Sequence, residues 1–369
     1  MRLFVAGFAI VFCASMIDGS TTLRAQNGTP SNRQGSQPGS QQGYQQGNQG
    51  NALDLLETAG RINGFFSPDS APWHLRATYS VLNAGGKVTS TGTYEIFWAG
   101  AKKVKQSYAS KEFSQTDYLT ESGMLRSGEM DWPMIADQRV TDNLFVHIPP
   151  REVLEKLDLA LTDRPIAGVA LRCVSLQAKG NPSKSNSPPT FCLDRATPAL
   201  RYSSGLGSNV IEQQSGTIFN NFVMFRGHAV SRDMTVAYKD RPSLKIHVDV
   251  LEDLAASNDD LFTPPANAAH PLPKRRYVDQ LRMEARITQK SAPAFGLPDA
   301  AATEVMGMLD VIVGKDGLVK SVRPIMGPLM YEQGEINAVK KQKYQPTLVD
   351  GVPVEVETEI GYVFTTHPR

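Results

Sequence analysis

The sequence has few of the residue patterns from which catalytic and metal sites are built. Its six histidines are dispersed, and no two are spaced four residues apart as in a zinc-binding helix. Its three cysteines form no CxxC pair, and the chain has neither a Gly-x-Ser-x-Gly elbow nor a phosphate-binding P-loop. We therefore expect no catalytic residues, no metal, no cofactor and no enzymatic activity.

An excess of charge of either sign is also missing. The 38 Lys and Arg residues nearly balance the 37 Asp and Glu residues, and the formal net charge of +1 gives no electrostatic reason to expect nucleic acid. We interpret the basic triplet Lys274-Arg275-Arg276 as a solvated linker, with a functional basic patch as the alternative. We interpret the alternating residues Glu355, Glu357 and Glu359 as the solvated face of an exposed strand.

Long apolar runs are rare, and the one near the start is short. Residues 3–16 are apolar and follow Arg2, but they are too few for a comfortable membrane span. The pattern predicts a signal peptide over residues 1–25 and a periplasmic or secreted protein. An uncleaved leader that anchors the chain in the inner membrane is the alternative.

Only two of the three cysteines can act in a mature exported protein, because Cys13 lies in the leader. Cys173 and Cys192 are expected to form a disulfide in an oxidising compartment. Two buried free thiols are the alternative.

The 369 residues can form two domains and a tail, and a hydrophobic content of 41% is ordinary for a globular protein. We predict an α+β chain. The Gln/Gly-rich residues 26–50 form a disordered linker, residues 51–269 form a β-rich domain, residues 270–298 form a second linker, and residues 299–369 form a small C-terminal domain.

The β-rich region begins with helical spacing and continues with alternating apolar residues. Leu53, Leu56 and Ala59 suggest a short opening helix, and a second helix is expected over residues 151–159, after Pro149-Pro150. Strands are predicted by alternation at several places, which include residues 74–81, 91–98, 219–225, 234–238 and 244–250. Many antiparallel strands with few helices predict a curved sheet or half-barrel.

Together with the opening helix, three segments of this region resemble the LolA-like half-barrel of lipoprotein carriers. They are Trp73-His-Leu-Arg-Ala77, Gly92-Thr-Tyr-Glu95 and Arg226-Gly-His-Ala-Val230. The resemblance implies a concave face that holds an apolar ligand such as an acyl chain. Its lining would include Tyr79, Tyr94, Ile96 and Trp98, for which ordinary core packing is the alternative.

The last sixty residues change their periodicity in an informative order. Residues 308–313 and 318–323 predict a hairpin around Gly314-Lys315-Asp316-Gly317. Residues 332–343 have helical spacing, and residues 354–364 alternate strictly. We expect one face of this last strand to pack on the helix and the other to face solvent.

This stretch is similar to the TonB C-terminal domain family over residues 311–322, 337–347 and 350–356. The resemblance implies a β-β-α-β domain that binds the short N-terminal box of an outer-membrane receptor by strand addition. It also implies coupling to an inner-membrane proton-channel complex. The residues expected nearest the bound peptide are Val356, Thr358, Ile360 and Tyr362.

The sequence thus predicts a periplasmic TonB-like energy transducer or adaptor, linked to transmembrane transport at the outer membrane. The alternative is a LolA-like carrier of lipid or lipoprotein with a C-terminal docking domain. A third hypothesis is a secreted structural protein whose last domain is only an interaction fold.

Overall fold

The computed structural model describes most of the chain from residue 41 onward. The described residues are 41–66, 70–82, 86–111, 113–132, 135–180, 188–206, 215–238, 241–255, 259–272, 275–291, 303–326, 329–349 and 351–366. The predicted leader and residues 26–40 of the predicted linker lie outside them. No helix in the described ranges is long and apolar enough to cross a membrane.

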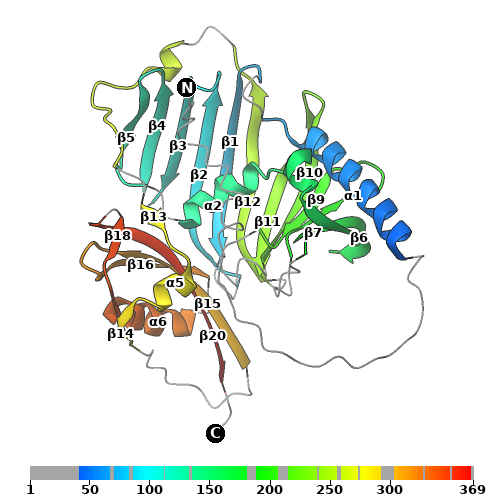
Figure 1. The fold of residues 1–369 in the computed structure, drawn as a ribbon. Coiled ribbons are helices and arrows are strands. Elements are labelled where there is room, and N and C mark those ends of the chain that lie inside the picture. Colours follow the sequence, from blue (N-terminus) through cyan, green and yellow to red (C-terminus); the bar gives the residue numbers. More distant parts are fainter. Residues whose placement is uncertain are drawn as a thin grey trace, which may run out of the picture. The chain divides into compact units, whose positions relative to one another are not determined.

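Twelve antiparallel strands form one large sheet, whose strands turn progressively from one edge to the other (Figure 1). The order is β5-β4-β3-β2-β1-β12-β11-β10-β9-β8-β7-β6, so two series of hairpins meet at the centre, where β1 pairs with β12. The prediction of a large curved antiparallel sheet with few helices is confirmed. The strands are β1 Trp73–Leu82, β2 Val88–Trp98, β3 Val104–Ser110, β4 Ser114–Thr120, β5 Gly123–Gly128, β6 Leu157–Ile166, β7 Val169–Ala178, β8 Thr190–Leu193, β9 Leu200–Ser204, β10 Ser215–Phe225, β11 His228–Tyr238 and β12 Arg241–Asp253.

The turn between β10 and β11 shows how local sequence sets strand register. Arg226 and Gly227 have φ of 52° and 82°, as in a type I′ turn, whose twist matches that of the flanking strands. Phe225 therefore lies directly opposite His228, and the pairing continues to Ser215 and Tyr238.

Three helices contribute to the core on one face of this sheet: α1 Gln41–Asn63, α2 Ile135–Leu144 and α3 Arg151–Leu154. Ala52, Leu56 and Ala59 of α1 are completely buried, at the spacing of one helical face, and belong to the same core as the inward side chains of β1, β2 and β12. The opening helix is thus confirmed, and it is longer than predicted. It starts at Gln41, so residues 41–50 of the predicted disordered tract are helical.

The helix expected over residues 151–159 is much shorter than predicted. It ends at Leu154, and β6 begins at Leu157. Leu157, Leu159 and Leu161 alternate along β6 and point toward the core, and all of β6 pairs with β7. Pairing with β7 outweighs the helical propensity of these residues.

Cys173 and Cys192 form a disulfide, as predicted, between directly opposed positions of β7 and β8. Both residues are completely buried. The bridge closes a loop of 19 residues in sequence separation, which restricts the unfolded chain.

Replacing both cysteines by alanine is expected to lower the free energy of unfolding by about 3 kcal/mol, chiefly because the unfolded chain regains that freedom. Urea unfolding followed by circular dichroism measures the change. Wild-type protein unfolded in dithiothreitol should lose a similar amount. Equal stability of the alanine variant and the oxidised protein would contradict this expectation.

We call the described part of residues 41–272 the large lobe and the described part of residues 275–366 the small lobe. The small lobe contains a four-stranded sheet in the order β13-β20-β15-β16. The predicted hairpin, helix and last strand are confirmed as elements, with boundaries that differ by several residues. The elements are β13 Arg276–Tyr277, α5 Gln280–Glu284, β14 Ile287–Gln289, β15 Thr303–Val313, β16 Val319–Met326, α6 Leu329–Lys341, β17 Lys343–Tyr344, β18 Thr347–Val349, β19 Val352–Val354 and β20 Val356–Thr366.

One face of β20 contributes to the small-lobe core with Ile336 and Val339 of α6, as predicted. The prediction of a solvated opposite face was wrong, because Glu357 and Glu359 are 4% and 1% exposed. Arg139 of α2 pairs with Glu359 at 2.7 Å. Large-lobe residues therefore reach the acidic face of β20.

The interpretation of the basic triplet as a solvated linker was also wrong for Arg275, whose side chain is only 7% exposed. Its guanidinium binds Glu355 at 2.6 Å and also contacts Asp131. Glu355 in addition binds Lys320, and these two cations lower the pKa of its carboxyl against the opposing effect of burial, which is the largest contribution. Arg275 thus bridges carboxylates of the two lobes.

The α6 residue Glu335 gives the small lobe a pH-dependent stability. Burial raises the pKa of its carboxyl from 4.5 to about 7. The protonated form is favoured in the folded state, so its stabilisation is complete below pH 4.5 and is lost as the pH rises through 7.

Across this window, wild type should lose on the order of 1–3 kcal/mol relative to Glu335→Gln. Comparing the two proteins cancels the titration of all other groups. The measurement is urea unfolding of both at a series of pH values. Parallel stability profiles would show that Glu335 does not titrate in this way.

Candidate functional site

A cluster of aromatic rings lies on the helix-covered face of the large sheet. Trp73 opens β1 and lies directly opposite Trp98, which ends β2, and their ring centroids are 6.3 Å apart. Phe65 and Phe66 follow α1, and Phe145 follows α2. Phe66 contacts both indoles, with centroid distances of 5.9 Å to Trp73 and 4.6 Å to Trp98. We call these five residues the aromatic cluster.

Both α1 and α2 end beside the same region of the sheet. The phenylalanines that follow them therefore meet the tryptophans of β1 and β2. Phe145 lies 6.2 Å from Trp73 and 6.1 Å from Phe65, measured between ring centroids. Phe66 meets both indoles edge to face, an arrangement that adds about 0.5–1.5 kcal/mol per pair beyond area burial. The cluster is therefore a stable part of the core and also a large apolar surface under the helices.

The four residues predicted to line a ligand site do share this face. Tyr79, Tyr94, Ile96 and Trp98 are all buried in one hydrophobic core with α1. Burial, as the largest cause, raises the pKa of the Tyr94 hydroxyl well above its usual value, so this group stays neutral. Packing beneath the helices accounts for the burial of all four, and ligand contact by them stays a prediction.

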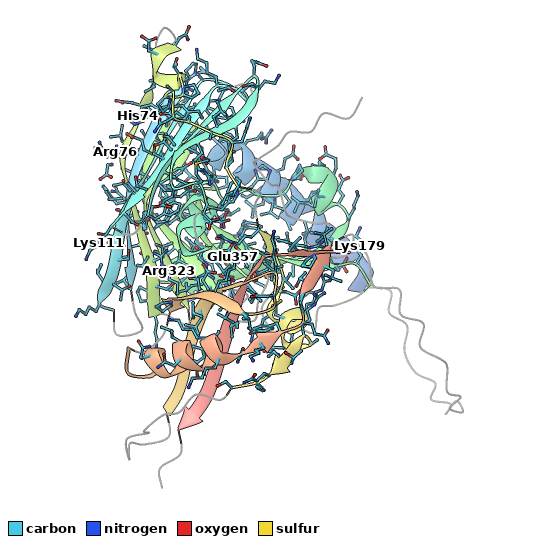
Figure 2. The ribbon with its side chains drawn as sticks, turned by 90° about the vertical axis from the view of Figure 1, so that its left-hand side faces the viewer. His74, Arg76, Lys111, Lys179, Arg323 and Glu357 are labelled. Atoms are coloured by element: carbon cyan, nitrogen blue, oxygen red, sulfur yellow. A yellow bond between two sulfur atoms is a disulfide. The ribbon has the colours of Figure 1, made fainter. Side chains whose placement is uncertain are left out.

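Charged residues of the same strands point the other way. His74 and Arg76 alternate with the buried Trp73, Leu75 and Ala77, and Figure 2 shows them on the side of the sheet away from α1. His74 bridges Glu95 and Glu252 through its two ring nitrogens, at 2.9 and 2.8 Å. The helix-covered face is thus the apolar side of the sheet.

Two polar atoms of the aromatic cluster have no partner among the described residues. They are the indole N–H groups of Trp73 and Trp98, both buried. An unpaired buried donor costs about 1–3 kcal/mol, and most buried polar groups in folded proteins are paired. These two groups are the clearest chemical feature of this face.

The described side chains of α2 contact this face through both apolar and polar groups, with Leu144 half-buried against the core. Val140 is its one fully buried side chain among those described, residues 138–144. Thr141 accepts a hydrogen bond from the Tyr108 hydroxyl at 3.4 Å, and Asn143 accepts one from the Thr217 hydroxyl at 2.5 Å. By contrast, α1 buries four apolar residues. Among the described side chains, α2 therefore contributes fewer fully buried apolar residues to this core than α1 does.

The predicted peptide-binding residues lie on β20. Val356 and Thr358 are buried, whereas Ile360 and Tyr362 are half-buried. One edge of β20 pairs with β15 along its whole length. Groups of this chain also occupy parts of the other edge, where β13 pairs with Val356 and Glu357, and the Gln280 side chain bonds to the backbone N–H and C=O of Gly361. Peptide binding by this strand stays a prediction.

No protein-family model matches the chain, and no curated protein sequence matches it. Similar solved structures include a DUF1329 family protein from Desulfovibrio piger, with 13% identity and a TM-score of 0.39. A putative outer membrane lipoprotein-sorting protein domain from Vibrio parahaemolyticus has 11% identity and a TM-score of 0.36. A LolA superfamily protein from Nitrosomonas europaea has 10% identity and a TM-score of 0.34. Each alignment covers 58% of this chain and 97% of the other chain.

These similarities are of the kind that the LolA-like resemblance predicted. At such low identities and TM-scores they carry no conclusion about the function of this chain. Nothing in the comparisons supports the TonB resemblance, so energy transduction, the receptor box and the proton-channel complex stay predictions without further support.

Sequence reasoning missed part of the aromatic cluster and all of α2. Phe65-Phe66 directly follows the predicted opening helix, and this position would have been a usable signal. Phe145 was missed because no helix was predicted over residues 135–144, although Ala136, Val140 and Leu144 recur at the four-residue spacing of a helical face. In the part of the chain that the structure describes, no three His, Cys, Asp or Glu side chains are placed to hold a metal ion.

Proposed function

We propose that this protein is a non-enzymatic carrier of an apolar, acyl-type ligand, which binds between the large sheet and its helices. The observation that carries the proposal is the aromatic cluster beneath α2. It offers an apolar surface, unpaired donors and a cover whose described side chains include one that is fully buried, Val140. The leader predicted over residues 1–25 would place such a carrier in the periplasm or outside the cell.

The proposed route of entry follows from how the two longer helices are held. Four apolar residues fix α1 to the sheet, whereas the described side chains of α2 contribute one fully buried residue and several polar contacts. Water can replace polar contacts when a helix moves, but it cannot replace buried apolar contacts at low cost. A ligand would therefore enter by displacing α2 while α1 stays in place.

The test is to measure binding of diphenylhexatriene, a hydrocarbon that fluoresces in apolar surroundings, to the purified folded protein. We expect saturable binding with about one probe per chain, and slower hydrogen exchange in β1 and β2 when the site is filled. Native mass spectrometry of protein made in a bacterial host should show retained acyl species. A folded protein that binds no probe and retains no lipid would overturn the proposal.

A further inference from the structure

We infer that the ligand carries a neutral carbonyl group, as in an acyl ester or amide, and that the indole N–H groups of Trp73 and Trp98 donate hydrogen bonds to it. The inference rests on the proposed function and adds the chemical class of the ligand. It starts from the two unpaired donors, which lie on directly opposed residues of neighbouring strands.

The other side chains of the aromatic cluster offer these two donors no hydrogen-bond acceptor. The rings in contact with the two indoles are Phe65, Phe66 and Phe145, and none of these side chains has an acceptor. Trp73 is 0% exposed and Trp98 is 3% exposed, so bulk water does not reach them in this conformation. An indole N–H is only a donor, so the group that satisfies it must be an acceptor.

Charge considerations favour a neutral acceptor over a carboxylate or a phosphate. One cation at the border of the cluster is Arg226, which stacks on Phe225 at 4.9 Å. Its guanidinium already binds Asp253 and donates to the carbonyl oxygens of Ala71 and Pro72. An anion beside the indoles would gain no free cation from Arg226, and burial of an unpaired charge is strongly disfavoured, whereas an ester or amide carbonyl needs only the two N–H donors.

The third tryptophan provides a matched control. The Trp132 N–H donates to the carbonyl oxygen of Leu272 at 2.7 Å, and its ring stacks on the buried guanidinium of Arg126 at 4.5 Å. Replacing Trp132 by phenylalanine removes an indole N–H that already has a partner. It should therefore leave ligand preference unchanged.

The experiment compares two competitors for the diphenylhexatriene site, namely methyl dodecanoate and pentadecane, which have the same number of heavy atoms. The quantity measured is the hydrocarbon concentration that displaces half of the probe, divided by the ester concentration that does so. Its wild-type value is the reference, because the hydrocarbon gains more free energy on leaving water than the ester does. Trp73→Phe and Trp98→Phe should each lower this ratio about 5- to 10-fold, the contribution of one hydrogen bond. Trp132→Phe should keep it.

The outcomes separate this inference from the proposed function. If the probe binds but Trp73→Phe and Trp98→Phe both keep the wild-type ratio, the carrier proposal stands and the carbonyl inference is wrong. If the probe does not bind at all, both proposals fail. The probe is excited at wavelengths where tryptophan does not absorb, so the substitutions do not disturb the signal.

Discussion

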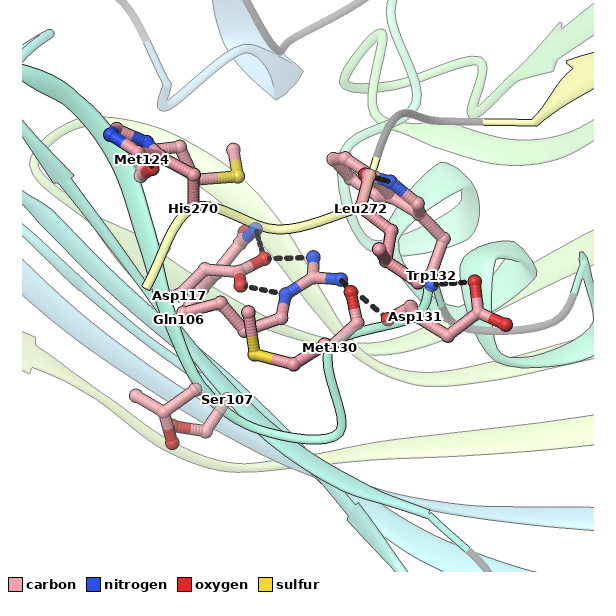
Figure 3. A network of polar contacts seen from close by, with 11 residues as sticks. Gln106, Ser107, Asp117, Met124, Met130, Asp131, Trp132, His270 and Leu272 are labelled. Carbon is pink, nitrogen blue, oxygen red and sulfur yellow. Dashed lines mark hydrogen bonds and ion pairs between the residues drawn. The ribbon is translucent and has the colours of Figure 1, made fainter. Parts of the chain in front are cut away.

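Replacing Arg126 by methionine is expected to lower the free energy of unfolding by about 3–5 kcal/mol, the cost of leaving a buried charge without its partner. Arg126 lies on β5 and is completely buried, and its guanidinium forms two bonds to the carboxylate of Asp117 on β4 (Figure 3). It also donates to the backbone carbonyls of Met130 and Asp131. Methionine fills much of the same volume but supplies none of these donors.

The same residue also helps to close the edge of the large sheet. The backbone N–H and C=O of Arg126 pair with Ala269, at 2.7 and 2.9 Å, so residues that follow β12 cover the outer side of β5. Unpaired strand edges invite association with other chains. Arg126→Met should therefore also increase aggregation during refolding.

Urea unfolding measures the loss in the free energy of unfolding, provided that its dependence on urea concentration has the same slope in both proteins. Two further variants show whether the loss comes from the buried ion pair. Lys102→Met breaks an ion pair whose side chains are 63% and 81% exposed, and it should cost less than about 1 kcal/mol. The double variant Asp117→Leu/Arg126→Met removes both charges and should recover much of the stability. If Arg126→Met lowers the free energy of unfolding by less than about 1 kcal/mol, the Asp117 carboxylate does not remain buried and unpaired in that variant.

The sequence predicted those strands in which one face is apolar and the other polar. The alternation over residues 244–250 and 354–364 matches β12 and β20 because one face of each strand packs in an apolar core and the other carries polar side chains, which leaves a period-two pattern. The strands β3, β4 and β5 carry Gln106, Asp117 and Arg126 at inward or covered positions, and these residues interrupt the pattern. A buried ion pair cannot be distinguished from two surface charges by composition alone.

The error at Glu357 and Glu359 has a related cause. Alternation specifies that the two faces of a strand differ, but not what covers each face. Arg139, which covers Glu359, lies 220 residues earlier in the chain. A short local pattern contains no trace of a contact over that distance.

Removal of the Arg139 guanidinium should have the second large effect, a loss of about 3–5 kcal/mol on substitution by methionine, because Glu359 is 1% exposed. Arg139 also reaches the sulfur of Met308 on β15, at 3.6 Å. It therefore ties α2 to two strands of the small lobe. Besides the change in stability, amide hydrogens of α2 should exchange faster in Arg139→Met, since the substitution removes a contact that holds the helix in place.

Two variants test whether this effect comes from the ion pair. Arg282→Met removes an arginine of the small lobe whose side chain is 77% exposed, and it should change neither stability nor exchange in α2. Exchanging the charges in Arg139→Glu/Glu359→Arg should restore part of the loss relative to Arg139→Glu alone, because the attraction is re-formed in reverse. If Arg139→Met unfolds at the wild-type urea concentration and α2 exchanges at the wild-type rate, the helix is held by its contacts to the sheet, and the small lobe has no influence on access to the aromatic cluster.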